Sequence, residues 1–228
     1  MDSLQPCEAV IFDLDGTLAD TAGDMALAIK RTLADFGLPP HSQDVVRGMV
    51  GNGLKKLVER AFAQHGVTLD DAAQAKAFAR LLEHYSADPC EYSKLYPGVR
   101  ATLEALNAAG IECAVLTNKH EPIALDVLQD LGITGLFKAV QGEKSGFPRK
   151  PDPASALGLV QALGATPETT VVVGDSETDL KTARAAALRA ILVTYGYSTV
   201  PVTTLGADAV INHLHELVPG LALTAEAD

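Results

Sequence analysis

Short apolar runs alternate along this chain with longer segments in which apolar residues recur at helical spacing. Six runs rich in branched and small apolar residues are Ala9–Phe12, Ile111–Leu116, Leu136–Gln141, Thr170–Val173, Ala190–Thr194 and Ala209–Ile211. Helical periodicity separates several of them, for example over Pro97–Ala109 and Pro153–Leu163. Because strands that alternate with helices form parallel sheets covered on both faces, the pattern predicts an α/β fold with a doubly wound, Rossmann-like sheet.

One long segment, from about residue 19 to residue 92, interrupts this alternation. It is rich in Ala, Leu, Lys and Arg and contains no clear strand pattern. Thr21-Ala22-Gly23-Asp24 has the spacing of a capping box that opens a helix, and Gly37-Leu38-Pro39-Pro40 would stop it. The segment is roughly 70 residues long, which is longer than the smallest typical domains of about 50 residues. We therefore expect a helical cap domain, 19–92, inserted into a core of residues 1–18 and 93–228. A long helical excursion packed on the core is the alternative.

Composition restricts the class of protein. The chain has 228 residues and 47% hydrophobic content, enough for a sizeable core, and it has no apolar run of about 18 residues that would span a membrane. Its first residues, Met1-Asp2-Ser3-Leu4, lack the basic start of a signal peptide. Cys7, Cys90 and Cys113 form no Cys-x-x-Cys pair, which favours plain packing and a reducing, cytoplasmic location.

The charge balance restricts the partners. The formal net charge is −11 at pH 7, and the sequence contains no basic patch. This argues against nucleic acid as a partner. An anionic substrate would be repelled by the field of the whole chain, so its binding requires a local metal cation and a lysine.

Two carboxylates stand one residue apart where the first apolar run ends. Asp13 and Asp15 follow that run, and Gly16 ends the strand. Ligands bind at the carboxyl ends of strands in open α/β sheets, and two buried like charges require a cation or a shared proton. The pattern therefore predicts a metal site with a reaction at it. The calcium loop of an EF-hand does not fit, because Leu18 and Asp24 occupy its Gly and Glu positions.

Polar groups also end three later strands. Thr117-Asn118-Lys119 follows the second run, Lys150 comes after the third, and Gly174-Asp175 opens a polar turn after the fourth. The carboxyl ends of parallel strands share one sheet edge, so these groups are expected to converge. Phosphoryl transfer uses such a set: a carboxylate nucleophile, Mg²⁺ with oxygen ligands, a lysine and a hydroxyl on the phosphate, and a second carboxylic acid for proton transfer.

In this order, the four stretches resemble the motifs of the haloacid dehalogenase superfamily of phosphatases. The resemblance covers nearly the whole chain, including the helical insert. It implies that Asp13 is the nucleophile and Asp15 the general acid/base. It also implies that Thr117 and Asn118 bind the phosphate, and that Lys150 steadies Asp13 and the phosphate.

The same resemblance implies a magnesium site. Asp13, Asp175 and the backbone carbonyl of Asp15 look like its ligands, and Asp179 looks like a support of the metal shell. From the sequence alone, Asp179 could instead be only a favourable charge at a helix start.

Several other polar residues have plainer interpretations. Lys119 is expected to be solvated rather than catalytic. Lys144 and Arg149 could either reach the site or stay exposed. His213 and His215 have no partner motif for metal binding and are expected at the surface or in packing.

The segment Val50-Gly51-Asn52-Gly53 lacks the third glycine of a dinucleotide fingerprint and reads as a loop before a helix over Leu54–Gln64. It is similar to the cap loop of the phosphoglycolate phosphatase subgroup, as is Leu192-Val193-Thr194-Tyr195-Gly196-Tyr197 near the last strands. The resemblance implies that Asn52 contacts the substrate, and a structural turn is the alternative.

The expected activity is Mg²⁺-dependent hydrolysis of a small phosphate monoester through an aspartyl-phosphate on Asp13. The subgroup resemblance implies 2-phosphoglycolate as the substrate, with glycolate and phosphate as products. A pyrophosphatase, a nucleotidase, a sugar phosphatase or a phosphomutase are alternatives. So is a non-catalytic binding protein, because a fold does not fix a function. A dehalogenase is disfavoured, because Asp15 is superfluous when no alkoxide leaves.

Overall fold

A parallel β-sheet forms the centre of the protein. The computed structural model describes residues 7–50 and 53–220, so Asn52 and the carboxyl-terminal tail lie outside the described residues. Within these residues six strands form the sheet, in the spatial order β5 (Ala139–Glu143), β4 (Glu112–His120), β1 (Ala9–Phe12), β6 (Thr170–Gly174), β7 (Arg189–Val193) and β8 (Ala209–Ile211). Every neighbouring pair is parallel. The prediction of a doubly wound α/β fold is confirmed.

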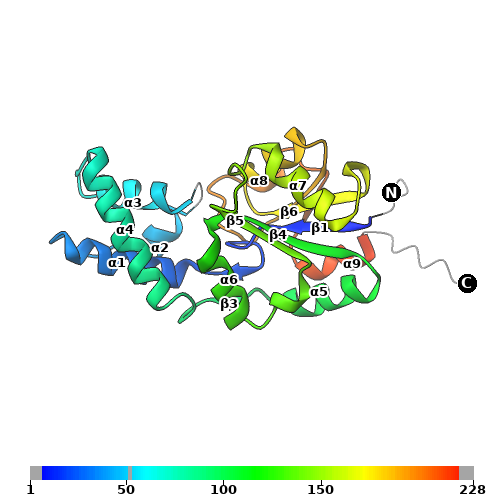
Figure 1. Cartoon of the computed structure of the whole chain (residues 1–228), viewed down its shortest axis with the longest axis horizontal. Coiled ribbons are helices and arrows are strands. Elements are labelled where there is room, and N and C mark those ends of the chain that lie inside the picture. Colours follow the sequence, from blue (N-terminus) through cyan, green and yellow to red (C-terminus); the bar gives the residue numbers. More distant parts are fainter. Residues whose placement is uncertain (1–6, 51–52, 221–228) are drawn as a thin grey trace, which may run out of the picture.

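Helices cover both faces of the sheet (Figure 1). One face carries α5 (Val99–Ala108), α6 (Glu121–Asp130) and α9 (Leu217–Gly220), and the other carries α7 (Pro153–Leu163) and α8 (Glu177–Ala185). Alternation along β1 divides its side chains between the two layers, because Val10 and Phe12 pack in one apolar cluster and Ala9 and Ile11 in the other. One-turn 3-10 helices occupy connections at η1 (Thr134–Leu136), η2 (Pro167–Thr169), η3 (Val202–Thr204) and η4 (Leu214–Glu216).

The strand order changes direction at β1, and its register sets the level of the site. The chain leaves β1 for β4 and β5 on one side and returns to β6, β7 and β8 on the other. Phe12 pairs with Val115 of β4 and with Val173 of β6. The residues just beyond these three positions therefore lie at one height at the carboxyl edge of the sheet, where open α/β sheets bind ligands.

Four further helices lie together beyond that edge (Figure 1). They are α1 (Ala22–Asp35), α2 (Gln43–Arg47), α3 (Gly53–Ala63) and α4 (Asp71–Ala87). The antiparallel strands β2 (Ala19–Asp20) and β3 (Lys94–Leu95) pair where the chain enters and leaves this helical group. The short β2 corrects the expectation that the inserted segment contains no strand. The division into a cap and a core domain at residues 19 and 92 stays a prediction.

The expected capping box at the start of α1 is wrong. The Thr21 side chain makes no capping bond and instead donates to Asp15, while the Asp24 carboxylate accepts from the backbone N–H of Ser93 at 2.8 Å. The cap comes from elsewhere: the Tyr197 hydroxyl accepts from the N–H of Thr21 at 2.7 Å and from the next N–H at 3.0 Å. Tertiary partners have taken both side chains that the local pattern assigned to the cap.

In the part of the chain that the structure describes, none of the helices is long and apolar enough to cross a bilayer.

Candidate active site

A cavity of about 250 Å³ opens between the sheet edge and the helical group. Its wall on the sheet side includes Asp13, Thr117 and Asp175, from the ends of β1, β4 and β6. Its wall on the helical side includes Met25 of α1 and Leu54 of α3. The cavity thus combines a polar floor at the strand ends with an apolar roof.

Asp13 lies at the centre of the polar floor. Its Oδ1 atom accepts from the backbone N–H of Leu14 at 2.8 Å and lies 2.9 Å from Nζ of Lys150. Burial raises the pKa of Asp13 to about 7; Lys150 opposes this shift, while the charges of Asp179 and Asp15 add to it. The carboxylate is therefore fixed by one oxygen in a place where its negative charge is costly without more cations.

Lys150 is a buried cation shared by two carboxylates. Its Nζ atom lies 2.9 Å from Asp13 and 2.7 Å from Asp179, and 3% of its side chain is exposed. Its backbone is held by Asn118, whose side-chain amide accepts from the Lys150 N–H at 2.9 Å and donates to its carbonyl at 3.1 Å. The Asn118 side chain therefore positions Lys150, and phosphate binding by Asn118 stays a prediction.

Three carboxylates converge beside Lys150. Single oxygens of Asp13, Asp175 and Asp179 all lie within 4.8 Å of one another. Burial raises the pKa of Asp175 well above its usual range, and the charges of Asp179 and Asp13 add to the effect. Carboxylate oxygens crowded in this way fit a hard divalent cation such as Mg²⁺, which prefers oxygen ligands and would compensate their charge.

The two later carboxylates are held by their surroundings. Asp175 accepts from the backbone N–H of Tyr197 at 2.5 Å. Asp179 receives Lys150 on one oxygen, and on the other it receives the N–H of Ser176 at 3.1 Å and its hydroxyl at 2.5 Å. Ser176 and Asp179 form the capping box of α8, so the helix-start interpretation of Asp179 and its place beside the carboxylate group are both realised.

Glycines give these carboxylates room. A Cβ atom at Gly196 would lie 2.2 Å from Cβ of Asp175, and one at Gly174 would lie 2.2 Å from Cγ of Asp179. Gly16 has φ +85°, and a Cβ there would lie 2.4 Å from Oδ2 of Asp175. Sequence reasoning identified Gly16 only as a strand end and missed the requirement for space at the other two.

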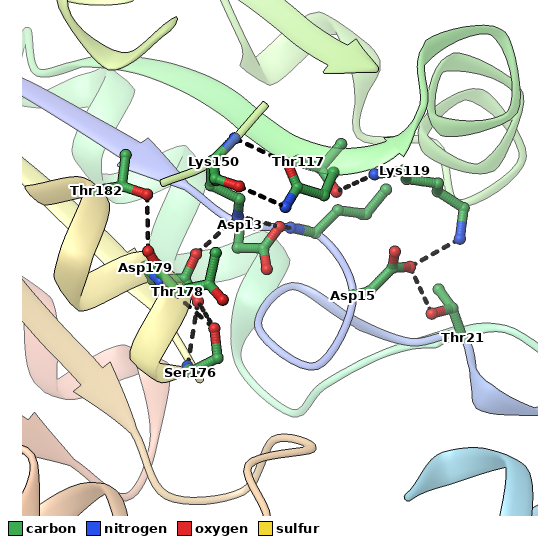
Figure 2. A network of polar contacts seen from close by, with 12 residues as sticks. Asp13, Asp15, Thr21, Thr117, Lys119, Lys150, Ser176, Thr178, Asp179 and Thr182 are labelled. Carbon is green, nitrogen blue, oxygen red and sulfur yellow. Dashed lines mark hydrogen bonds and ion pairs between the residues drawn. The ribbon is translucent and has the colours of Figure 1, made fainter. Parts of the chain in front are cut away.

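The Asp15 side chain points away from the three-carboxylate group (Figure 2). Its Oδ1 atom accepts from the Thr21 hydroxyl at 2.6 Å and from Nζ of Lys119 at 2.8 Å. The two carboxylates of the Asp-x-Asp pattern therefore face different partners. This separation allows one of them to attack phosphorus while the other handles a proton at the leaving oxygen.

The expectation that Lys119 is solvated is wrong. None of its side chain is exposed, and Nζ donates to Asp15 and, at 2.5 Å, to the hydroxyl of Tyr85 on α4. Burial lowers the pKa of Lys119, but Asp15 and Tyr85 outweigh it, so the pKa is raised above its ordinary value and the ammonium stays charged. Thr117 and Lys119 both line the cavity, and the position of Lys119 directly after Thr117-Asn118 near a strand end is the signal that could have identified this lysine.

The remaining candidates differ in how close they lie to the cavity. Thr117 is buried, and its hydroxyl accepts from the N–H of Lys119 at 3.1 Å. Lys144 is exposed, whereas Arg149 is half-buried, 3.8 Å from Glu143. His213 is exposed and stacks on its neighbour two residues later, as expected for a surface position.

Comparison with known proteins gives consistent similarities. The family model described as haloacid dehalogenase-like hydrolase matches residues 10–193. A phosphoglycolate phosphatase of Agrobacterium fabrum is 41% identical over 212 residues, covering 92% of this chain and 91% of that protein. A phosphoglycolate phosphatase of Rhodospirillum rubrum is 42% identical over 214 residues, covering 92% and 89%.

Solved structures with similar folds include proteins of the same kind. A predicted phosphoglycolate phosphatase from Haemophilus somnus superposes with a TM-score of 0.88 at 32% identity, covering 95% of this chain and 99% of that one. The protein CbbY from Rhodobacter sphaeroides, solved in complex with phosphate, superposes with a TM-score of 0.79 at 25% identity, covering 94% and 99%.

Proposed function

Since this chain belongs to the haloacid dehalogenase-like hydrolase family, we propose that it hydrolyses 2-phosphoglycolate to glycolate and phosphate. The observation that carries the phosphatase chemistry is the convergence of Asp13, Lys150 and two further carboxylates at the sheet edge beside the cavity, with Asp15 oriented separately. The choice of substrate rests on relatives near 40% identity that cover most of the chain.

In the first half-reaction, an oxygen of Asp13 forms a bond to phosphorus while the bond from phosphorus to the glycolate oxygen breaks. Asp15 gives its proton to that leaving oxygen, so glycolate departs as the alcohol. Lys150 and the Thr117 hydroxyl are placed to bind phosphoryl oxygens as charge develops on them. The product of this step is an aspartyl-phosphate on Asp13.

In the second half-reaction, water replaces Asp13 on phosphorus. Asp15, left ionised by the first step, takes a proton from the water as its oxygen bonds to phosphorus. The bond from phosphorus to the Asp13 oxygen breaks, which releases phosphate and regenerates the carboxylate. Both halves thus use the same two side chains, with Asp15 changing from acid to base.

Asp13, Asp175 and the Asp15 backbone carbonyl would hold Mg²⁺, and Asp179 would steady this group through its contacts to Lys150 and Ser176. When bound, the ion neutralises charge on the phosphoryl group. Four carboxyl and two ammonium groups line the cavity among the described residues, so an added cation is needed before an anionic ester can approach.

The helical group α1–α4 would act as a cap over the cavity. Its apolar contributions to the wall, Met25, Leu54 and Leu57, support a role in excluding water around a small substrate. The cap-loop residue Asn52 remains a candidate substrate contact. The three free cysteines support a reducing, cytoplasmic setting.

The test is a panel of phosphate esters with purified protein, scored by phosphate release as kcat/KM. We expect 2-phosphoglycolate to rank above nucleotides, pyrophosphate and sugar phosphates, and EDTA to abolish release until Mg²⁺ is restored. A higher rank for another ester would overturn the substrate and leave the phosphatase chemistry standing. Phosphate release from none of them in the presence of Mg²⁺ would overturn the chemistry itself.

A further inference from the structure

Two lysines line the catalytic cavity, and they are not equivalent. In the described wall of the cavity the cations are Lys119 and Lys150. Lys150 lies within 2.9 Å of two carboxylates, Asp13 and Asp179. Its charge is therefore balanced by the phosphoryl-transfer machinery before any substrate arrives.

Lys119 has fewer charged partners than Lys150. Its only carboxylate partner among the described residues is Asp15, at 2.8 Å, and its other partner is the Tyr85 hydroxyl. Burial raises the pKa of Tyr85 above its ordinary value, so this phenol remains neutral. One ammonium thus faces one carboxylate and one neutral oxygen, and the third of its N–H donors has no partner among the described residues.

The position of Lys119 relative to the phosphate-binding floor suits a short, doubly anionic ester. Thr117 and Lys119 are two residues apart near the carboxyl end of β4, where the pairing with β5 shifts register, and both line the cavity. In 2-phosphoglycolate a single methylene lies between the ester oxygen and the carboxylate. A phosphoryl group at Asp13 and Thr117 would therefore leave the carboxylate within the reach of the flexible Lys119 side chain.

We propose that Lys119 is the residue that recognises the carboxylate of the substrate, and that Tyr85 of α4 holds its ammonium group in place for this contact. The proposal rests on 2-phosphoglycolate being the substrate. Burial would strengthen the contact between the Lys119 ammonium and the substrate carboxylate, because a charge-assisted hydrogen bond is stronger away from water. It also connects the helical group to selectivity, since Tyr85 lies on α4 whereas Lys119 lies on the sheet.

A competing explanation is that Lys119 only orients Asp15. The two explanations differ in what they predict for an ester that lacks the carboxylate. If Lys119 only orients Asp15, its loss lowers kcat/KM equally for every ester, because every ester needs the proton transfer. If Lys119 binds the carboxylate, its loss lowers kcat/KM more for the ester that carries the carboxylate than for the ester that lacks it.

The experiment compares 2-phosphoglycolate with 2-hydroxyethyl phosphate, in which a hydroxymethyl group replaces the carboxylate. The measured quantity is the ratio of the two kcat/KM values in wild type, Lys119→Met and Lys119→Arg. We expect the ratio to fall about 10- to 100-fold in Lys119→Met, the range of one hydrogen bond to a charged group. We expect Lys119→Arg, which keeps the charge, to restore part of the ratio.

Tyr85→Phe provides a second variant in case Lys119→Met does not fold, because it removes one oxygen and keeps the ring. We expect it to lower the same ratio by a few-fold, with the loss mainly in KM for 2-phosphoglycolate. If either variant lowers kcat/KM equally for both esters, so that the ratio keeps its wild-type value, the proposal is overturned. If wild type itself prefers a nucleotide or a sugar phosphate, the proposed substrate fails; a wild-type preference for 2-phosphoglycolate with an unchanged variant ratio overturns only the role of Lys119.

Discussion

Single residues in this site depend on neighbours that contribute no chemistry of their own. Asp175 can approach Asp13 and Asp179 because Gly196 leaves space beside it. A methyl group at Gly196 would meet Cβ of Asp175 at 2.2 Å, closer than real Cβ contacts, so the carboxylate must shift. The φ angle of Gly196 is not in the positive range that favours glycine, so the expected effect of a substitution comes from the lack of space alone.

Gly196→Ala is therefore expected to weaken Mg²⁺ binding about 10- to 100-fold, the usual cost of disturbing the surroundings of a metal ligand. The measurement is the Mg²⁺ concentration that gives half-maximal phosphate release. Gly135→Ala is the matched control, because a Cβ there meets nothing within 4 Å. Identical Mg²⁺ dependence in the two variants would show that Asp175 does not need this space.

The individual residues also show how far the sequence could lead. The convergence of Asp13, Lys150, Asp175 and Asp179 could be predicted because each of them lies at the end of a predicted strand or in the loop that follows it. Lys119 was misjudged because lysine is usually exposed, and its partner Tyr85 comes from a helix 34 residues away in sequence. Burial of a charge depends on a tertiary partner, and one-dimensional patterns do not contain it.

At the scale of elements, the strands could be predicted and their junctions could not. The six apolar runs match the sheet strands to within a few residues, because branched apolar runs bounded by turn residues are a local signal. The start of α1 could not be predicted, since its cap is a hydroxyl that lies 176 residues further along the chain. Tyr197 also donates to Asp20 at 2.7 Å, and its backbone N–H binds Asp175, so one residue contacts both the entrance to the helical group and the carboxylate group.

Tyr197→Phe tests this junction. Losing the hydroxyl leaves the N–H of Thr21 without its acceptor and the N–H of Ala22 with only its longer contact to Asp20 at 3.3 Å, and an unsatisfied buried polar group costs about 1–3 kcal/mol. We expect the free energy of unfolding in urea to fall by about that amount. Tyr92→Phe, at an exposed tyrosine, is the control and should change it by no more than about 0.5 kcal/mol. Equal stability of the two variants would contradict the capping role of Tyr197.

At the scale of the whole molecule, an acidic chain concentrates further negative charge at one sheet edge. The formal net charge is −11, and three carboxylates crowd within 4.8 Å of one another at that edge. Folding brings these groups together and removes them from water, so in the metal-free protein the site opposes folding when its carboxylates are ionised. Burial of the two apolar clusters on the faces of the sheet offsets this cost.

This cost has a definite pH dependence. Burial raises the pKa of Asp13 to about 7, against an ordinary value of 3.8, and burial raises that of Asp175 as well. Between about pH 4 and pH 7 the folded metal-free protein therefore binds more protons than the unfolded chain, so this contribution to the free energy of unfolding falls as the pH rises. Each unit of raised pKa corresponds to about 1.4 kcal/mol.

Mg²⁺ should reverse the trend, because it binds the ionised carboxylates and competes with protons for them. We expect the increase in Tm on replacing EDTA by Mg²⁺ to be larger at pH 8 than at pH 5.5, with NaCl matching the ionic strength. Asp175→Asn should lose most of the increase at both pH values, which separates the site from general salt effects. An increase that is the same at both pH values in the wild-type protein would mean that Mg²⁺ does not displace protons from these carboxylates, and the metal would then have to be sought elsewhere in the molecule.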